Sequence, residues 1–267
     1  ASTVSSATAS TTTPTEQERA QHALTQLSDY AHDSYAAHGL LFAMLLADPT
    51  FLAHNEQLDR IHQHYGQALL KITLNAYEQL PFLRDEQRLP LVELAIPALK
   101  EISHEQFRQL RQQLTQLVKA DGKISLFEWC LYRLTMQYLE AHFESAQART
   151  AKYGKMSAIA DACTVVFAYC ARHGHSDNAM ADHALQQALS AAGIESSIMT
   201  AQGINPQQLK PLNVALTRLQ QAYPHLKARV IKGLLASIDS DQQRLPVELD
   251  LVRTIAAILE TPLSEFG

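Results

Sequence analysis

Hydrophobic residues recur at intervals of three and four along most of the chain, which is the spacing of a helix that buries one face. Two such stripes are Phe107, Leu110, Leu114 and Leu117, and later Ile231, Leu234, Leu235 and Ile238. Strictly alternating runs, which are typical of strands, are nearly absent. Good helix formers (Ala, Leu, Gln and Glu) dominate the composition. The pattern predicts an all-α protein with roughly ten to twelve helices in a multi-helical bundle.

Proline and glycine predict where these helices end. The expected breaks are Asp48–Pro49, Leu80–Pro81, Leu89–Pro90, Asp121–Gly122, Gly154, Gly174, Gly193, Asn205–Pro206, Tyr223–Pro224 and Leu245–Pro246. A further proline, Pro97, lies inside the helical pattern that runs from Leu89 to Ile102. Because proline removes a backbone hydrogen bond, we expect it to kink or split that helix.

The composition divides the chain into three parts. Residues 1–15 are small, polar and almost uncharged, so they predict a disordered linker, either from a larger protein or as a flexible terminus. Residues 16–145 and 146–267 form two predicted helical halves, which the less apolar stretch 144–155 connects. At 267 residues and 46% hydrophobic content, the chain is long enough for one large or two small domains.

Each half contains a short acidic turn between two helical segments. The first is Asp121-Gly122-Lys123-Ile124-Ser125, and a looser copy begins about 120 residues later at Asp239-Ser240-Asp241. The recurrence indicates an internally repeated helix-turn-helix unit.

Helix capping accounts for these turns. Gly122 can adopt the left-handed conformation that ends a helix, and Ser125 with Glu128 has the spacing of a capping box. In the second turn, Pro246 fits the first turn of the next helix, and Glu248 adds favourable charge near the positive end of that helix.

A divalent cation such as Ca²⁺ is the alternative explanation of the same residues. Its ligands would be Asp121 and Glu128 in the first turn, and Asp239, Asp241 and Glu248 in the second. The spacing departs from an EF-hand loop, since glycine directly follows the first aspartate and no glutamate stands at the twelfth position. We favour capping and keep the cation as an alternative.

Two stretches carry a resemblance to a known family. They are Arg88 to Lys100 with Ala120 to Trp129, and Ile238 to Phe266 with its closing Thr261-Pro262-Leu263; Leu40 to Pro49 and Gly174-His175 fit more loosely. They resemble the C-terminal cytoplasmic region of bacterial HtpX-like membrane metallopeptidases, zincins of the CAAX-prenyl-protease type. Both acidic turns are also similar to the helical TerB-like module of tellurite-resistance proteins.

The resemblance implies that this chain is a cytoplasmic fragment of an inner-membrane zinc metalloendopeptidase. The parent's zinc and membrane spans would then lie upstream of Ala1. The family's His-Glu-x-x-His motif is missing here, and the nearest approach is His104-Glu105-Gln106-Phe107-Arg108, which has arginine at the second ligand position. No catalytic residue is therefore carried over, and we expect neither enzyme activity nor a cofactor in this fragment.

The composition argues against some classes of binding partner. The net charge of −5 comes without a concentrated basic face, which argues against nucleic acid. The longest apolar run, Leu40 to Ala47, is much shorter than the roughly 20 residues of a membrane span.

Cys130, Cys163 and Cys170 have no Cys-x-x-Cys spacing, so we interpret them as small buried residues of a protein in a reducing compartment.

Histidine-rich stretches offer a second possible metal site. His62 and His64 point to different faces of a helix, whereas the His173–His175 pair could converge with Asp177 or His183. We interpret both groups as polar surface residues, because a metal site needs three or four converging ligands. Nucleophile elbows and glycine-rich phosphate loops are absent from the sequence.

These observations favour a non-catalytic accessory domain that regulates the parent or binds a protein partner or the parent's own peptidase domain. A groove between the two halves is the expected contact surface, since helical modules commonly bind peptides in grooves. One alternative is a metal-responsive TerB-like binding module. Another is the peptidase activity of the parent, with the catalytic residues outside this chain.

Overall fold

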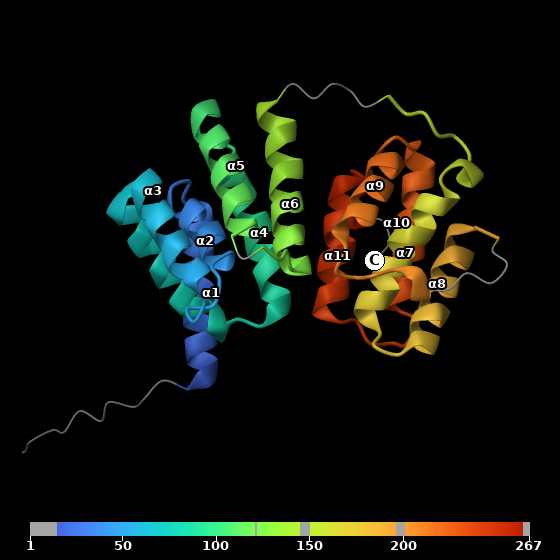
Figure 1. The fold of residues 1–267 in the computed structure, drawn as a ribbon, viewed down its shortest axis with the longest axis horizontal. Helices are drawn as coiled ribbons and strands as arrows, with labels where there is room; N and C mark the ends of the chain where they lie inside the picture. The colour runs from blue at the N-terminus through green and yellow to red at the C-terminus, as the bar shows by residue number, and fades with distance from the viewer. Residues whose placement is uncertain (1–14, 121, 145–149, 196–200, 264–267) are drawn as a thin grey trace, which may run out of the picture.

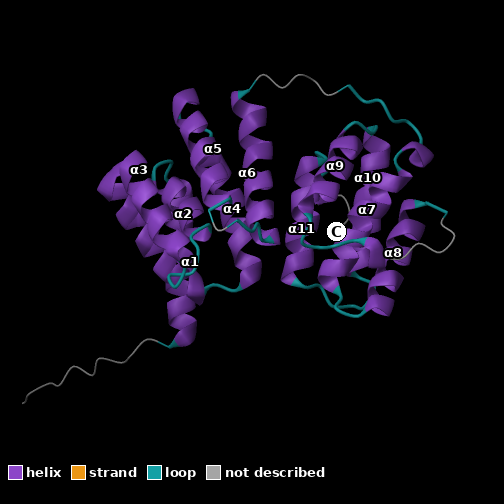
Figure 2. Ribbon diagram, viewed as in Figure 1, coloured by secondary structure: helices purple, strands orange, loops and turns teal. Residues whose placement is uncertain are grey.

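The computed structural model describes residues 15–120, 122–144, 150–195 and 201–263. Within these ranges the protein contains eleven α-helices, three short 3₁₀ helices and no strand (Figure 1, Figure 2). The predicted all-α fold and helix number are confirmed.

Six α-helices make up the first half. They are α1 (Glu16–His32), α2 (Ala36–Met44), α3 (Leu52–Gln79), α4 (Asp85–Leu99), α5 (His104–Val118) and α6 (Leu126–Phe143), with the 3₁₀ helix η1 (Leu80–Phe82) after α3. The second half contains α7 (Ala160–Gly174), α8 (Asn178–Ala192), α9 (Leu209–Gln220), α10 (Pro224–Ile238) and α11 (Pro246–Ile258), with η2 (Met156–Ala158) and η3 (Ala201–Gly203).

The predicted domain limits fall mostly outside the described ranges. Of the expected linker 1–15, only Thr15 is described, and it caps α1: its hydroxyl accepts from the Glu18 amide, and its own amide donates to Glu18. The limit between 145 and 146 lies in the stretch that the structure does not describe, between α6 and residue 150.

The break predicted at Leu89–Pro90 and the split predicted at Pro97 are wrong. No break occurs at Leu89–Pro90, and Pro97 does not split its helix: α4 runs from Asp85 to Leu99 with both prolines inside it. The prolines stand seven residues apart, on one face of the helix, and neither is buried. Water can therefore reach the carbonyl groups that lose their intrahelical partner, which reduces the penalty of an internal proline.

An unpredicted break lies within α3. Gly66 has a φ of 80° and a ψ of 177°, so α3 consists of two helical segments that meet at this residue. Glycine adopts such a conformation without the steric cost of a side chain. We call residues 52–65 the first segment of α3.

The two halves repeat the same helix order. Both ends of α10 lie 120 residues after the corresponding ends of α5, and α6 and α11 begin 120 residues apart. Earlier in each half, Gly66 ends the first segment of α3 and Gly193 ends α8, both with positive φ and 127 residues apart. The midpoints of α2 and α7 are also 127 residues apart. The repeat therefore matches α2 to α6 with α7 to α11, and α1 is additional.

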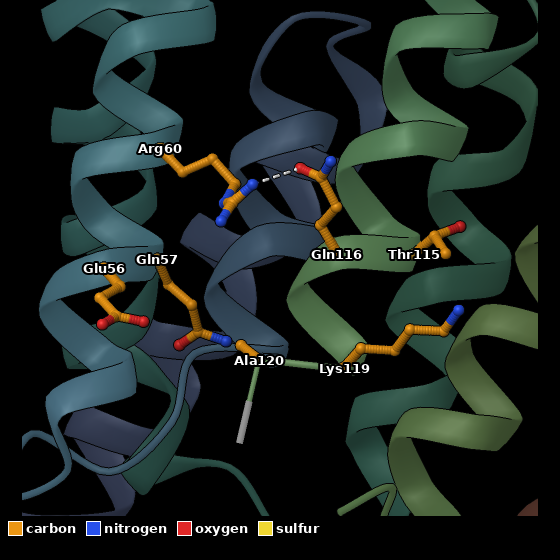
Figure 3. A pocket seen from close by; sticks show the side chains of 7 residues that line it. All are labelled: Glu56, Gln57, Arg60, Thr115, Gln116, Lys119 and Ala120. Atoms are coloured by element: carbon orange, nitrogen blue, oxygen red, sulfur yellow. Dashed lines mark hydrogen bonds between the residues drawn. The ribbon is translucent and has the colours of Figure 1, made fainter. Parts of the chain in front are cut away.

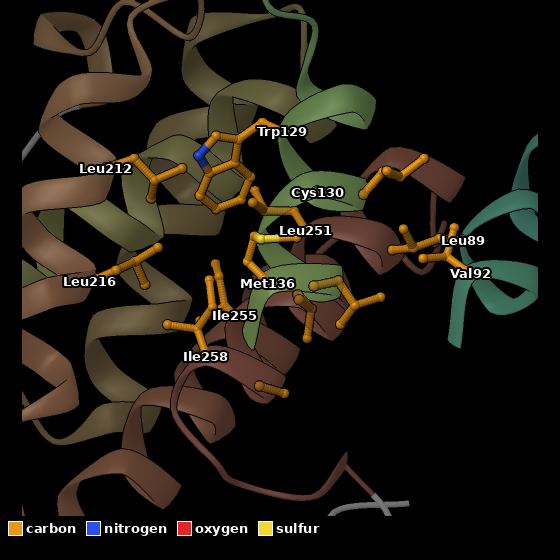
Figure 4. Close-up of a cluster of buried hydrophobic side chains, with 14 of the residues drawn as sticks. Leu89, Val92, Trp129, Cys130, Met136, Leu212, Leu216, Leu251, Ile255 and Ile258 are labelled. Carbon is orange, nitrogen blue, oxygen red and sulfur yellow. The ribbon is translucent and has the colours of Figure 1, made fainter. Parts of the chain in front are cut away.

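The halves meet through α6 and α11, which lie side by side at the centre of Figure 1. Figure 4 shows the side chains that fill this contact, from α4, α6, α9 and α11. Cys130 and Ile255 are fully buried there, and the buried residues of both halves form one continuous hydrophobic cluster. The protein thus has one core shared by two copies of a helical unit.

Polar contacts accompany this apolar contact. The Trp129 indole on α6 donates to Asn213 Oδ1 on α9 at 3.1 Å. Arg253 on α11 faces Glu93 on α4, with 3.6 Å between Nε and Oε2. Burial raises the pKa of Asp250 on α11 to about 6, although Arg253 counteracts the shift. Polar contacts as well as buried apolar area therefore hold the two halves together.

Small residues bring α8 and α10 close together in the second half. The face of α8 toward α10 is a stripe of buried alanines: Ala181, Ala184, Ala188 and Ala192. Opposite them stands Gly233, where an added Cβ would lie 2.8 Å from the Ala188 carbonyl oxygen and 2.5 Å from Phe167 Cζ. Space at Gly233 therefore determines how closely these helices pack.

Replacing Gly233 by alanine should lower the free energy of unfolding by about 1–3 kcal/mol, because the new methyl group forces α8 and α10 apart. Alanine's better helix propensity offsets only part of this loss. Gly203→Ala is the control, since nothing lies within 4 Å of its added Cβ. Urea titrations that place both variants within about 0.5 kcal/mol of the wild type would contradict this account.

Candidate functional site

A groove of about 310 Å³ lies between α3 and α5 in the first half (Figure 3). From α3 it is lined by Glu56, Gln57 and Arg60, and from α5 and its end by Thr115, Gln116, Lys119 and Ala120. In Figure 3, the Gln57 and Arg60 side chains extend toward α5, whereas Lys119 extends away from α3. The groove is thus bounded by amide, guanidinium and carboxylate groups.

The repeat explains why α3 and α5 stand apart although their counterparts, α8 and α10, are closely packed. On the first segment of α3, the positions that match the alanine stripe of α8 carry His54, Gln57, Ile61 and Tyr65. On α5, Gln113 stands where α10 has Gly233. These longer side chains hold α3 and α5 apart, whereas α8 and α10 touch closely. A difference in side-chain size therefore opens a groove where the second half has a packed helix pair.

Gln57 spans the gap at the inner side of the groove. Its Nε2 donates to the carbonyl oxygens of Leu45 at 3.0 Å and Leu117 at 3.2 Å, and its Oε1 accepts from the Ala47 amide at 2.8 Å. The side chain is only 3% exposed. One glutamine thus connects the ends of α2 and α5 to α3 and satisfies three backbone groups.

Nearer to solvent, Arg60 and Gln116 bridge the two walls. Arg60 Nη1 donates to Gln116 Oε1 at 2.8 Å (Figure 3). Deeper in α5, the buried Gln113 has an Nε2 with no hydrogen-bond partner among the described residues. The walls are therefore joined by long side chains that can exchange these contacts for a ligand.

Exposed apolar residues flank the groove at the start of α3. Phe51 is 61% exposed and Leu52 is 74% exposed, one turn before Glu56. Large side chains with this exposure are uncommon in pairs on a surface that contacts only water. The surface formed by Phe51, Leu52 and the groove lining is called the α3–α5 surface below.

The first acidic turn is a capped helix junction. The Glu128 amide donates to Ser125 Oγ at 3.2 Å, and the Ser125 amide donates to Glu128 Oε2 at 2.7 Å. Gly122 has a φ of 74° and turns the chain after α5. Asp121 lies outside the described residues.

The second acidic turn holds its helix differently. Pro246 occupies the first turn of α11, and the Leu245 amide donates to Glu248 Oε2 at 3.1 Å, as in the first copy. Unlike Glu128, Glu248 is only 1% exposed, and burial with Asp241 and Asp239 nearby raises its pKa to about 7. The expected charge at the helix end is therefore neutralised in part near neutral pH.

The aspartates of this turn already have partners. Arg244 binds Asp239 through Nε at 2.6 Å and Nη2 at 3.0 Å. Asp241 Oδ1 accepts from the Gln243 amide, while its Oδ2 lies 3.6 Å from His175 Nδ1.

Among the described residues, no three His, Cys, Asp or Glu side chains are grouped closely enough to hold a metal ion. Within the described part of the chain, the alternative in which His173 and His175 converge with Asp177 or His183 is not found: Asp177 caps α8 through the Met180 amide, and His175 faces Asp241. The interpretation of His175 as a surface residue is wrong, since it is only 8% exposed. His62 and His64 are exposed. A cation at Asp121, Glu128, Asp239, Asp241 or Glu248 stays a prediction.

All three cysteines are buried and unpaired. Burial raises the pKa of Cys130 and of Cys163 to about 12, and it raises the pKa of Cys170 as well. Since the thiolate is the reactive form, these thiols are poor nucleophiles.

The prediction of a groove between the two halves does not match the groove described above, which lies between α3 and α5. The facing sides of α6 and α11 are buried core, whereas the α3–α5 groove lies within the first half. Sequence reasoning missed Gln57, Arg60 and Gln116. The sequence signal that could have identified them is the pair of polar residues His54 and Gln57. These residues share one helical face with Ile61, at the positions where α8 carries alanine.

Comparison with models of known protein families, with curated proteins and with solved structures finds no match to this chain. None of the helices in the described ranges combines the length and apolar character needed to cross a bilayer.

Gln57→Leu should lower the free energy of unfolding by about 3 kcal/mol, because the three hydrogen bonds that the buried Gln57 side chain makes to backbone groups are lost. Gln63→Leu, an exposed position on the same helix, is the control and should change stability by less than about 0.5 kcal/mol. Denaturant unfolding measures both. Equal stability of the two variants would show that Gln57 does not support the groove.

Ser125→Ala should cost about 1 kcal/mol, the usual loss when a helix cap is removed. Ser190→Ala, at an exposed site on α8, controls for the change of residue type. Thermal unfolding with and without millimolar Ca²⁺ adds a second comparison. A wild-type melting temperature that rises with Ca²⁺, together with no effect of Ser125→Ala, would favour the cation over the cap.

Proposed function

We propose that this chain is a non-catalytic helical module that binds a segment of another protein on the α3–α5 surface. The observation that carries the proposal is the groove beside Phe51 and Leu52, in a half whose repeat partner has closely packed helices instead. Groups that bridge the groove can pair with a bound backbone, while the two exposed side chains contact apolar residues.

The groove's chemistry favours a segment with an acidic and an apolar part. Arg60 has a neutral partner, Gln116, so its charge is available to a carboxylate. Phe51 and Leu52 offer apolar contact about two turns away along α3. A segment that carries an acidic residue and a bulky apolar residue a few positions apart would match this arrangement.

The biological setting of this module is proposed from the resemblance alone. The stretches Arg88 to Lys100 and Ala120 to Trp129 support an accessory role on the cytoplasmic face of a membrane zinc metallopeptidase. The bound segment then belongs to a substrate, a partner protein or the peptidase domain itself. The residues encoded upstream of Ala1 test this setting: hydrophobic spans and a His-Glu-x-x-His motif would support it, and a different domain would overturn it.

A photo-crosslinking residue at position 52 should capture one partner protein in cells, and the same residue at position 214 should not. Val214 is the matched control because it is 64% exposed on α9, in the other half. Mass spectrometry identifies the captured protein, which is then purified.

Calorimetry with that purified protein measures the affinity. We expect Arg60→Glu and Leu52→Asp each to weaken binding at least tenfold, whereas Val214→Asp leaves it unchanged. Crosslinks of equal yield at positions 52 and 214, or equal affinity for all variants, would contradict the proposed surface.

A further inference from the structure

The buried end of Glu248 has no counterpart in the first half. Its Oε1 has no hydrogen-bond partner among the described residues, although the side chain is 1% exposed. A Cβ at Gly174 would lie 1.8 Å from this oxygen, so the carboxyl group is pressed against the glycine at the end of α7. In the first half, Ala47 stands at the position of Gly174, and Glu128 remains partly exposed. The second half thus combines a buried carboxyl group with a glycine that leaves room for it.

Several polar groups surround this carboxyl group. From α7 comes the Cys170 thiol, whose pKa rises through burial first and then through Glu248, and Ser237 of α10 lies beside that thiol. From the turn come Asp239 and Asp241, which disfavour a further negative charge on Glu248, with Arg244 engaged by Asp239. His175, 8% exposed, closes the site: its Nδ1 faces Asp241, and its Nε2 lies 3.5 Å from Ser240 Oγ.

We propose that Glu248 is a proton-controlled latch, which fastens the second acidic turn to the end of α7 while its carboxyl group is neutral and releases the turn when the group ionises. A neutral carboxyl group tolerates the apolar contact with Gly174, whereas a carboxylate without a partner at Oε1 does not. Release lets the carboxylate reach water and loosens the start of α11, the helix through which the two halves meet.

The direction of the pH effect follows from the proton that the closed state retains. In the open state the carboxyl group has its ordinary pKa of 4.5, whereas in the closed state the pKa is about 7. Raising the pH through this interval therefore favours opening. With these values, the opening equilibrium rises about tenfold between pH 6 and pH 8. Asp250, with its pKa raised to about 6, adds about twofold if it is exposed in the same event.

Hydrogen exchange measures the opening directly. Peptides that cover 236–250 should lose about tenfold in protection between pH 6 and pH 8, after correction for the intrinsic chemical rates. Glu248→Gln keeps an acceptor for the Leu245 amide but cannot ionise, so its protection should change by no more than about twofold. Glu128→Gln is the matched control in the first half and should behave as the wild type.

His175→Gln separates the latch from a histidine effect, because histidine also titrates near neutral pH. Under this proposal His175→Gln retains the pH dependence. The proposal is overturned if the wild type shows no pH dependence, if Glu248→Gln keeps the tenfold change, or if the change disappears in His175→Gln instead.

Discussion

The packing of α6 against α11 is the contact on which the rest of the molecule depends. It joins the two halves into one hydrophobic core, with Cys130 and Ile255 fully buried and Trp129 hydrogen-bonded across to Asn213. Since each half is one copy of the same helical unit, this contact also fixes which side of each copy faces solvent. The α3–α5 surface and the second acidic turn both lie on helices that this core holds in place.

Differences between the two copies carry the functional argument. A common helix order would give both halves the same closed packing if the residues matched. Instead, glutamines at 57 and 113 replace alanine and glycine and separate α3 from α5, while Gly174 admits the Glu248 carboxyl group in the other half. One copy thus has a groove between two of its helices, and the other buries an acid beside the shared core.

Part of the structure could be predicted from the sequence because it depends on interactions between residues that are close together in the chain. Ser125 and Glu128 identify a capping box because only nearby residues take part, and the helical periodicity identified the fold class. The break at Gly66 was missed because a single glycine inside a helical pattern does not show whether the helix continues or ends at that residue. Pro90 and Pro97 misled because their tolerance depends on which face meets water. The groove depends on pairing residues across α3 and α5, which periodicity along one helix cannot reveal.

The claim of one shared core is tested most directly by two-probe unfolding. Trp129 is the only tryptophan and lies at the contact between the halves, so its fluorescence reports on that contact, whereas circular dichroism reports on all helices. The account predicts one transition with the same urea midpoint for both signals. Loss of the Trp129 signal at a lower urea concentration than the loss of helix would show that the halves fold separately, which would contradict the account.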